Sequence, residues 1–292
     1  MTWLAACDLD QTLIYSRNAF RLREGEAAPD VQIVEYSGGE PLSYVTRRAA
    51  AGLHDLSQAA TFVPVTTRTL EQYRRVDLGF RVPYAIAANG GHLLVDGVPD
   101  LAWSESVRAR LAASGRRLED VRAMAESLAA SGTWVRTIRD ADGFFVYLVA
   151  TSREVIPDLA ALETSLAGDG WTLSVQGRKV YLVPTALTKE AALAEVMGRS
   201  GAERLVAAGD SLLDRGMLGM AHAAVRPAHG ELHDQGYLRP GLAVTERAGI
   251  FAGEDIARHL CAVVSGAESV AVRSFSTQSS PVQGRVFGVG TG

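Results

Sequence analysis

The stretch WLAACDLDQT, residues 3–12, decides the fold that we expect for this chain. Its first part is an apolar run, and two carboxylates, Asp8 and Asp10, follow it at once. A short apolar run bounded by a polar loop is typical of a buried strand. In a parallel sheet, the loop after such a strand opens into a crevice at the carboxyl edge of the sheet. We therefore expect Asp8 and Asp10 to face that crevice.

Further apolar segments alternate with helical ones on both sides of the middle of the chain. The expected strands are 61–65, 84–88, 204–209, 223–227 and 242–246, and the expected helices are 47–59 and 188–199. Alternating helices and apolar strands favour a parallel sheet covered by helices. We therefore predict an α/β fold with a Rossmann-like parallel-sheet core.

The middle of the chain has a different pattern. A polar helical stretch at 104–131 precedes two apolar strand pairs, 134–138 with 144–150 and 171–175 with 179–183, and a helix at 153–167 separates the pairs. Such pairs indicate antiparallel strands and an α+β unit. We predict a core formed by 1–88 and 186–264, a cap domain inserted between them at 89–185, and a flexible C-terminal tail at 265–292.

The composition excludes several classes of protein. Of the 292 residues, 47% are hydrophobic and 21% are charged, so the chain is not expected to be disordered. No apolar run is long enough to span a bilayer, and the first residues lack the basic start of a signal peptide. The formal charge of −4 disfavours a nucleic-acid partner. We expect a cytoplasmic protein without membrane or nucleic-acid partners, and the oligomeric state stays open.

Lysine is rare in this sequence. Of the 29 basic residues, Lys179 and Lys189 are the two lysines and the rest are arginines, which a codon bias toward arginine explains. Lys189 begins a predicted helix after the strand at 179–183, where its charge could offset a phosphoryl group and a carboxylate. The sequence suggests no role for Lys179.

The residues after the first two strands suit phosphoryl chemistry. One carboxylate of the Asp8–Asp10 pair could attack as a nucleophile while the other moves protons, as transfer through an aspartyl phosphate requires. Thr66, Thr67 and Arg68 follow the strand at 61–65, where hydroxyls could donate to a phosphate oxygen. A solvated loop and a helix N-cap are the alternative explanations for these residues.

A third strand end supplies further acids. Asp210, Ser211 and Asp214 follow the strand at 204–209. Together with Asp8 and Asp10, Asp210 would form a hard oxygen site suited to Mg²⁺ rather than zinc. Asp214 could also be a cap or an ion-pair partner only.

Other segments near the predicted site are less specific. Asn89 and Gly90 follow the strand at 84–88, and a plain turn explains them as well as a phosphate or hinge contact does. The segment 31–46 predicts a hairpin that could cover the site. We expect packing or surface roles for three histidines, while a fourth, His92, lies at the junction of core and cap. The three are His222, His229 and His233.

These motifs, in this order, resemble those of the haloacid dehalogenase superfamily. The matching segments are DLDQT (8–12), VTTR (65–68), LTKEAAL (187–193) and GDSLLD (209–214), and the resemblance covers about 3–260. The large insertion is similar to that of the type IIB branch, which includes Cof-like and sucrose-phosphate-phosphatase-like enzymes. The resemblance implies a Mg²⁺-dependent phosphatase that acts on a small phosphoester, such as a sugar phosphate.

The resemblance also implies a role for each matching residue. Asp8 would be the nucleophile, Asp10 the general acid/base, and Thr66 the residue that binds the transferring phosphoryl group. Lys189 would stabilise the charge of that group and of Asp8. The Asp8 carboxylate, the backbone carbonyl of Asp10 and Asp210 would bind the metal. The surrounding residues would be Ser211 and Asp214 beside the metal, and Thr67, Arg68, Asn89 and Gly90 beside the substrate.

The sequence departs from the family pattern in two respects. Gln11 and Thr67 stand where many family members have glycine, which alters the walls of the phosphate pocket. The 58 positions between Asp8 and Thr66 exceed what a strand–helix–strand link needs. A phosphomutase of the phosphomannomutase type and a phospho-ligand-binding module without turnover are the alternative functions. Dehalogenation is disfavoured because Asp10 supplies an acid/base that halide displacement does not need.

Overall fold

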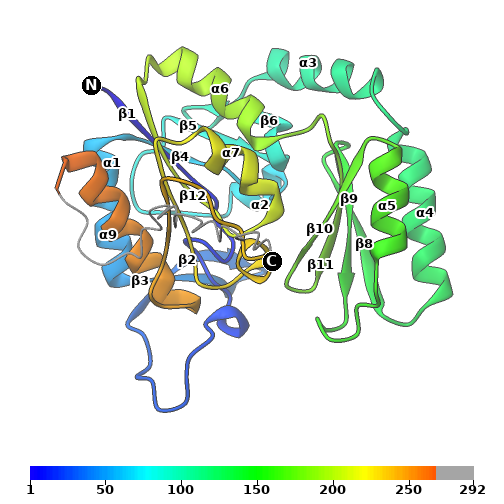
Figure 1. Cartoon of the computed structure of the whole chain (residues 1–292), viewed down its shortest axis with the longest axis horizontal. Helices are drawn as coiled ribbons and strands as arrows, with labels where there is room; N and C mark the ends of the chain where they lie inside the picture. The colour runs from blue at the N-terminus through cyan, green and yellow to red at the C-terminus, as the bar shows by residue number, and fades with distance from the viewer. Residues whose placement is uncertain (268–292) are drawn as a thin grey trace, which may run out of the picture.

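The computed structural model describes residues 1–267, and its larger part is built on a five-stranded parallel sheet (Figure 1). The strand order is β14-β13-β12-β1-β4. The strands are β1 (Trp3–Cys7), β4 (Thr61–Pro64), β12 (Arg204–Ala208), β13 (Ala223–Arg226) and β14 (Leu242–Val244). Strand β1 pairs in parallel with β4 on one side and with β12 on the other. The predicted parallel-sheet core is therefore confirmed.

Helices cover both faces of this sheet. Successive residues of a strand point to opposite faces, so alternate residues of β1 contact different helices. Ala5 and Cys7 of β1 share a core cluster with α1 (Arg47–Ala59) and α9 (Ala252–Ser265). Leu4 and Ala6 share the opposite cluster with α6 (Lys189–Ser200) and α7 (Arg215–Met220). Burial on both faces explains the continuous apolar run of β1.

Side-chain caps explain where the two predicted core helices begin. The Thr46 hydroxyl accepts from the Ala49 N–H at 3.0 Å before α1, and the Thr188 hydroxyl accepts from the Ala191 N–H at 3.3 Å before α6. The shorter helical segments are α2 (Leu70–Tyr73), α8 (Glu231–Asp234) and the 3₁₀ turns η1 (Arg17–Ala19), η2 (Ala88–Gly90), η3 (Leu212–Asp214) and η4 (Gly249–Phe251).

The strand expected at 84–88 forms as β5 (Tyr84–Ala87), at the margin of the parallel sheet. It joins that sheet through one parallel bridge between Val65 and Ile86. Its main partner is β6 (His92–Val95), which pairs with it antiparallel and in turn pairs with β7 (Val98–Pro99). The chain reverses after β5 because Ala88 and Asn89 have left-handed φ angles of 47° and 55°.

The predicted hairpin at 31–46 forms as β2 (Val31–Ser37) and β3 (Glu40–Thr46). Gly38 and Gly39 make the turn with φ angles of 60° and 84°, which glycine adopts readily. The pairing register shifts on both sides of Glu35. This bulge bears on the site described below.

The inserted unit is a four-stranded antiparallel sheet in the order β10-β11-β9-β8, with α4 and α5 on the face turned away from the core (Figure 1). Its elements, after the connecting helix α3 (Leu101–Ala112), are α4 (Leu118–Ser131), β8 (Val135–Ala141), β9 (Phe145–Ala150), α5 (Ala160–Gly168), β10 (Trp171–Gln176) and β11 (Lys179–Pro184). The expected α+β insertion in an α/β core is confirmed.

Two helices of this unit differ from the prediction. The single helical stretch expected at 104–131 is interrupted at 113–117, where Gly115 has a φ of 63° and the Arg116 N–H donates to the Asp169 carbonyl. The helix expected at 153–167 begins only at Ala160. Pro157 disfavours helical geometry at the residue before it.

The division of the chain into a core (1–88 and 186–264) and a cap (89–185) stays a proposal. Strand β6 pairs with β5, and its Leu93 belongs to the same core cluster as residues of β1. Both observations would move the boundary between core and cap from residue 89 toward residue 100. The predicted tail lies outside the described residues from position 268 onward. Within the described part, none of the helices has both the length and the apolarity needed to cross a bilayer.

Candidate active site

A buried lysine joins two carboxylates at the carboxyl edge of the parallel sheet. Asp8 follows β1 directly, and Lys189 is the first residue of α6. The Lys189 Nζ lies 2.6 Å from Asp8 Oδ1 and 2.6 Å from Asp214 Oδ1, and its side chain is fully buried. Burial alone would lower the pKa of Lys189, but the charges of Asp214 and Asp8 outweigh it and raise that pKa. Lys189 is therefore a permanent cation beside Asp8.

Asp214 uses both of its carboxylate oxygens. Its Oδ1 accepts from Lys189, while its Oδ2 accepts from the Asp210 N–H at 3.1 Å, the Ser211 N–H at 2.9 Å and the Ser211 hydroxyl at 2.7 Å. These bonds shape the loop after β12 and fix the position of the lysine. Asp214 is thus suited to orient its neighbours.

Asp8, Asp210 and Asp214 form a buried group whose carboxylate oxygens lie within 4.8 Å of one another, so the group could hold a metal ion. Burial is the largest cause that raises the pKa of Asp8 to about 7, against the opposing charge of Lys189. Burial and the charges of Asp8 and Asp214 also raise the pKa of Asp210. Three carboxylates with one ammonium have a net charge of −2 when ionised, which a divalent cation would balance.

Asp10 makes a two-pronged ion pair with Arg68. The Arg68 Nε and Nη2 lie 2.7 Å and 2.8 Å from the two Asp10 oxygens. Burial would raise the pKa of Asp10, but the charge and hydrogen bonds of Arg68 outweigh it and keep that pKa well below its usual range. Arg68 is therefore the direct partner of Asp10, the candidate general acid/base, and Asp10 is ionised in this arrangement.

Thr66 and Thr67 lie beside the loop that contains Asp8. The N–H of Val65, the residue before them, donates to the Cys7 carbonyl, which aligns the two strand ends. The buried Thr66 hydroxyl accepts from the Arg68 N–H at 3.2 Å, so it stabilises its own turn here. Thr67 is buried beside Tyr181 of the cap, and this proximity lowers the pKa of the Tyr181 hydroxyl against the raising effect of burial. Both predicted hydroxyls are thus close to the site, at its core and cap sides respectively.

Asn89 and Gly90 contact the beginning of α6. The buried Asn89 Nδ2 donates to the Leu187 carbonyl at 2.8 Å, and its Oδ1 has no partner within residues 1–267. Gly90 has a φ of +104°, and a Cβ there would collide with the Thr188 carbonyl. These two residues therefore support the segment that leads into Lys189. Their predicted contact with substrate stays a proposal.

The role of Glu35 was not predicted from the sequence, and Lys179 was left without one. Glu35 of β2 forms an ion pair with Arg68. Lys179 lies on the cap, with its Nζ 5.7 Å from the ring centre of Tyr147 and 6.0 Å from that of Tyr181, and its charge also lowers the pKa of Asp10. The rarity of lysine was the one signal that could have singled out Lys179. Nothing in the sequence links Glu35 to Arg68.

The histidines have internal partners. His229 Nε2 donates to the Gln11 carbonyl at 2.8 Å and its Nδ1 accepts from the Gly249 N–H at 3.1 Å, which supports Gln11 at a left-handed φ of 62°. Ring nitrogens of His222 and His233 bond to Leu205 and Arg226. His229 is buried while His222 and His233 are exposed, which agrees with the packing or surface roles predicted for these three residues. His92 bonds to Ser104 and to Asp142, between core and cap.

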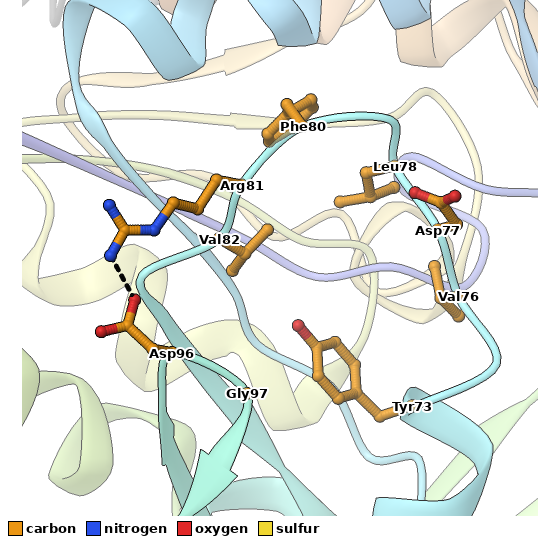
Figure 2. A pocket seen from close by; sticks show the side chains of 9 residues that line it. All are labelled: Tyr73, Val76, Asp77, Leu78, Phe80, Arg81, Val82, Asp96 and Gly97. Carbon is orange, nitrogen blue, oxygen red and sulfur yellow. Dashed lines mark hydrogen bonds and ion pairs between the residues drawn. The ribbon is translucent and has the colours of Figure 1, made fainter.

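A surface pocket of about 310 Å³ lies elsewhere on the core (Figure 2). Arg81 and Asp96 form an ion pair of 2.7 Å across one side of it, and Tyr73, Phe80 and Val82 contribute apolar surface. None of the predicted site residues lines it. We assign it no part in the chemistry of Asp8.

Several solved structures share this fold. The sucrose-phosphatase from Synechocystis is 13% identical with a TM-score of 0.57, and the match covers 89% of this chain and 98% of that one. A haloacid dehalogenase-like hydrolase from B. subtilis is 16% identical with a TM-score of 0.51, covering 88% and 98%. A phosphatase of the haloalkanoate (HAD) superfamily from Bacteroides thetaiotaomicron is 13% identical with a TM-score of 0.50, covering 90% and 96%.

No protein-family model and no curated protein sequence matches the chain. The solved structures nevertheless match about nine tenths of it. The chain has the fold of these haloacid dehalogenase-like structures, with an inserted α+β cap, as the motif resemblance predicted. With its buried Asp8, Asp210 and Asp214, it combines that phosphatase-type fold with a candidate catalytic aspartate cluster.

Proposed function

We propose that this protein is a Mg²⁺-dependent phosphatase that hydrolyses a small phosphorylated metabolite through an aspartyl phosphate on Asp8. The observation on which the proposal rests is the buried Lys189, 2.6 Å from both Asp8 and Asp214, in a group of three buried carboxylates. This environment suits a carboxylate that accepts a phosphoryl group, because the ammonium offsets the added negative charge.

In the proposed first step, Asp8 attacks the phosphorus and the bond to the leaving oxygen breaks. Asp10 donates a proton to that oxygen, and the alcohol departs. In the second step a water molecule attacks the phosphoryl group of Asp8, Asp10 takes its proton, and inorganic phosphate and the Asp8 carboxylate are released. For the first step one Asp10 oxygen must be protonated, so the bond from Arg68 to that oxygen gives way when substrate binds, while its bond to the other oxygen keeps the carboxyl group in place.

A magnesium ion would fit between Asp8 and Asp210, because Asp214 already uses both oxygens in hydrogen bonds. The Asp10 backbone carbonyl would complete the protein ligands. Oxygen donors with a net negative charge suit a hard divalent cation. The ion would supply charge stabilisation to the transferring phosphoryl group.

The side chains on the inner strands of the cap favour a polar or anionic substrate. Lys179, Tyr147 and Tyr181 lie on its inner strands, and the Tyr147 hydroxyl is bonded to the core residue Gln72 at 3.1 Å. The Synechocystis sucrose-phosphatase was solved with sucrose and phosphate, which favours a sugar phosphate for this chain also. The substrate-binding roles of Thr67, Arg68, Asn89 and Gly90 are part of this proposal.

Phosphate release from a panel of metabolite phosphoesters, with Mg²⁺ and then with excess EDTA, tests the proposal. We expect activity that EDTA abolishes and Mg²⁺ restores, and an Asp8→Asn variant that loses at least about 1,000-fold in kcat. Asp55→Asn, which changes an exposed aspartate of α1, is the matched control and should keep full activity.

Full activity of Asp8→Asn would overturn the assignment of the nucleophile. An isomerised product without free phosphate would replace hydrolysis by the phosphomutase reaction. Tight binding of a phosphoester without turnover of any in the panel would favour a binding module.

A further inference from the structure

The inserted hairpin β2–β3 reaches the acid/base candidate through one arginine. Arg68 donates from Nε and Nη2 to Asp10, and its Nη1 lies 2.9 Å from Glu35 Oε2. Arg68 is 8% exposed and the Glu35 side chain is fully buried. A guanidinium has a planar, rigid set of donors, so its orientation is decided by the two carboxylates that it joins.

Glu35 is itself firmly placed. Its Oε2 also accepts from the Ser43 hydroxyl at 2.6 Å, and its Oε1 lies 3.2 Å from Arg75 Nε. Ser43 is its cross-strand partner in β3. Alternating strand residues would point to opposite faces, yet Val34 and Glu35 are both buried, because the bulge around Glu35 turns its side chain inward.

Glu35 is not needed to neutralise the charge of Arg68, because the Asp10 carboxylate already accepts two bonds from the guanidinium. Glu35 adds a second anchor on the side of Arg68 away from Asp10. Without it, the described partners of Arg68 besides Asp10 are a Ser43 hydroxyl at 3.3 Å and a Gln72 carbonyl at 3.5 Å. The pair Arg68–Asp10 would then lose its fixed orientation.

We propose that Glu35 is a positioning residue for the phosphatase reaction: it fixes Arg68, and Arg68 fixes the Asp10 carboxyl group for proton transfer. This inference rests on the proposed function. It explains why a hairpin is inserted between Asp8 and Thr66: the hairpin supplies the outer anchor of the acid/base.

A comparison of leaving groups tests the proposal. A positioned acid accelerates departure of a poor leaving group such as an alkoxide, whereas 2,4-dinitrophenolate departs without protonation. We expect Glu35→Gln, which keeps size and removes charge, to lower kcat/KM for glycerol 3-phosphate by about 10- to 100-fold, because kcat/KM reports the step in which the alcohol departs. With 2,4-dinitrophenyl phosphate the kcat/KM of the same variant should stay within about 3-fold of the unchanged protein.

Glu40→Gln is the matched control, because Glu40 is an exposed glutamate of the same hairpin. Its rates with both esters should equal those of the unchanged protein. Ser43→Ala removes its hydrogen bonds with Glu35 and Arg68 but no charge, and it should produce a smaller loss confined to the alkyl ester. If Glu35→Gln does not fold, the ratio of the two rates in Ser43→Ala decides the question.

Equal losses of kcat/KM on both esters, or no loss on either, would overturn the positioning role and leave Glu35 as a structural residue. The proposed function fails by a different result: absence of hydrolysis of every ester by the unchanged protein.

Discussion

Lys189 is a fully buried ammonium whose partners, Asp8 and Asp214, are buried as well. Removal of one partner of a buried ionic group leaves the others without compensation, which is more costly than loss of an exposed pair. At the scale of single residues, this lysine is therefore predicted to combine a structural and a chemical function. The two lysines of the chain make this testable with one substitution at each position.

We predict that Lys189→Met destabilises the protein by about 3 kcal/mol or more and abolishes phosphate release. Lys179→Met should cost less than about 1 kcal/mol in stability, because the cation–π contacts with two tyrosines are modest. It should instead raise KM for anionic substrates. Urea unfolding followed by circular dichroism measures the first effect, and steady-state kinetics the second. Equal stability losses at both positions would contradict the buried-ion-pair argument.

At the scale of elements, the turn η2 and the helix α6 act as one support for Lys189. Asn89 bonds to Leu187, and Gly90 packs against the Thr188 carbonyl immediately before the helix. The sequence patterns predicted both elements, because a strand-ending turn and a threonine cap are local features. Their contact could not be predicted, since it joins residues about a hundred positions apart.

We predict that Gly90→Ala destabilises the protein by about 2 kcal/mol or more, since alanine is strained at a φ of +104° and its Cβ would displace α6. Gly198→Ala in the same helix is the matched control, because no heavy atom lies within 4 Å of the added Cβ. That control should stabilise by up to about 1 kcal/mol. Melting temperatures of the two variants should therefore move in opposite directions.

At the scale of the whole molecule, His229 joins the Asp8 loop to the segment before α9. Burial is the largest cause that lowers the pKa of His229 to about 4, against an ordinary value of 6.5. The unfolded chain binds a proton near pH 6.5 whereas the folded one does not, so the stabilisation is present above pH 6.5 and is lost as the pH falls toward 4.

Across that interval His229 should account for about 3 kcal/mol of the fall in unfolding free energy. We expect His229→Gln to be less stable at pH 7 but to depend less on pH between 4 and 6.5. His54→Gln, which replaces an exposed histidine of α1, should keep the full dependence. Chemical unfolding at a series of pH values checks this; parallel curves for the unchanged protein and His229→Gln would exclude the histidine as the cause.

The sequence alone determined the parallel strands of the core and the edge of the sheet at which the acids gather. Apolar runs define buried strands, and in a parallel sheet their ends meet at one edge, so Asp8, Thr66 and Asp210 could be grouped without coordinates. The tertiary structure decided which side chains pair: Arg68 with Asp10, and Glu35 with Arg68. Periodicity reports which face of an element is buried, but a pair between distant residues depends on how whole elements pack and, at Glu35, on a bulge that breaks the period.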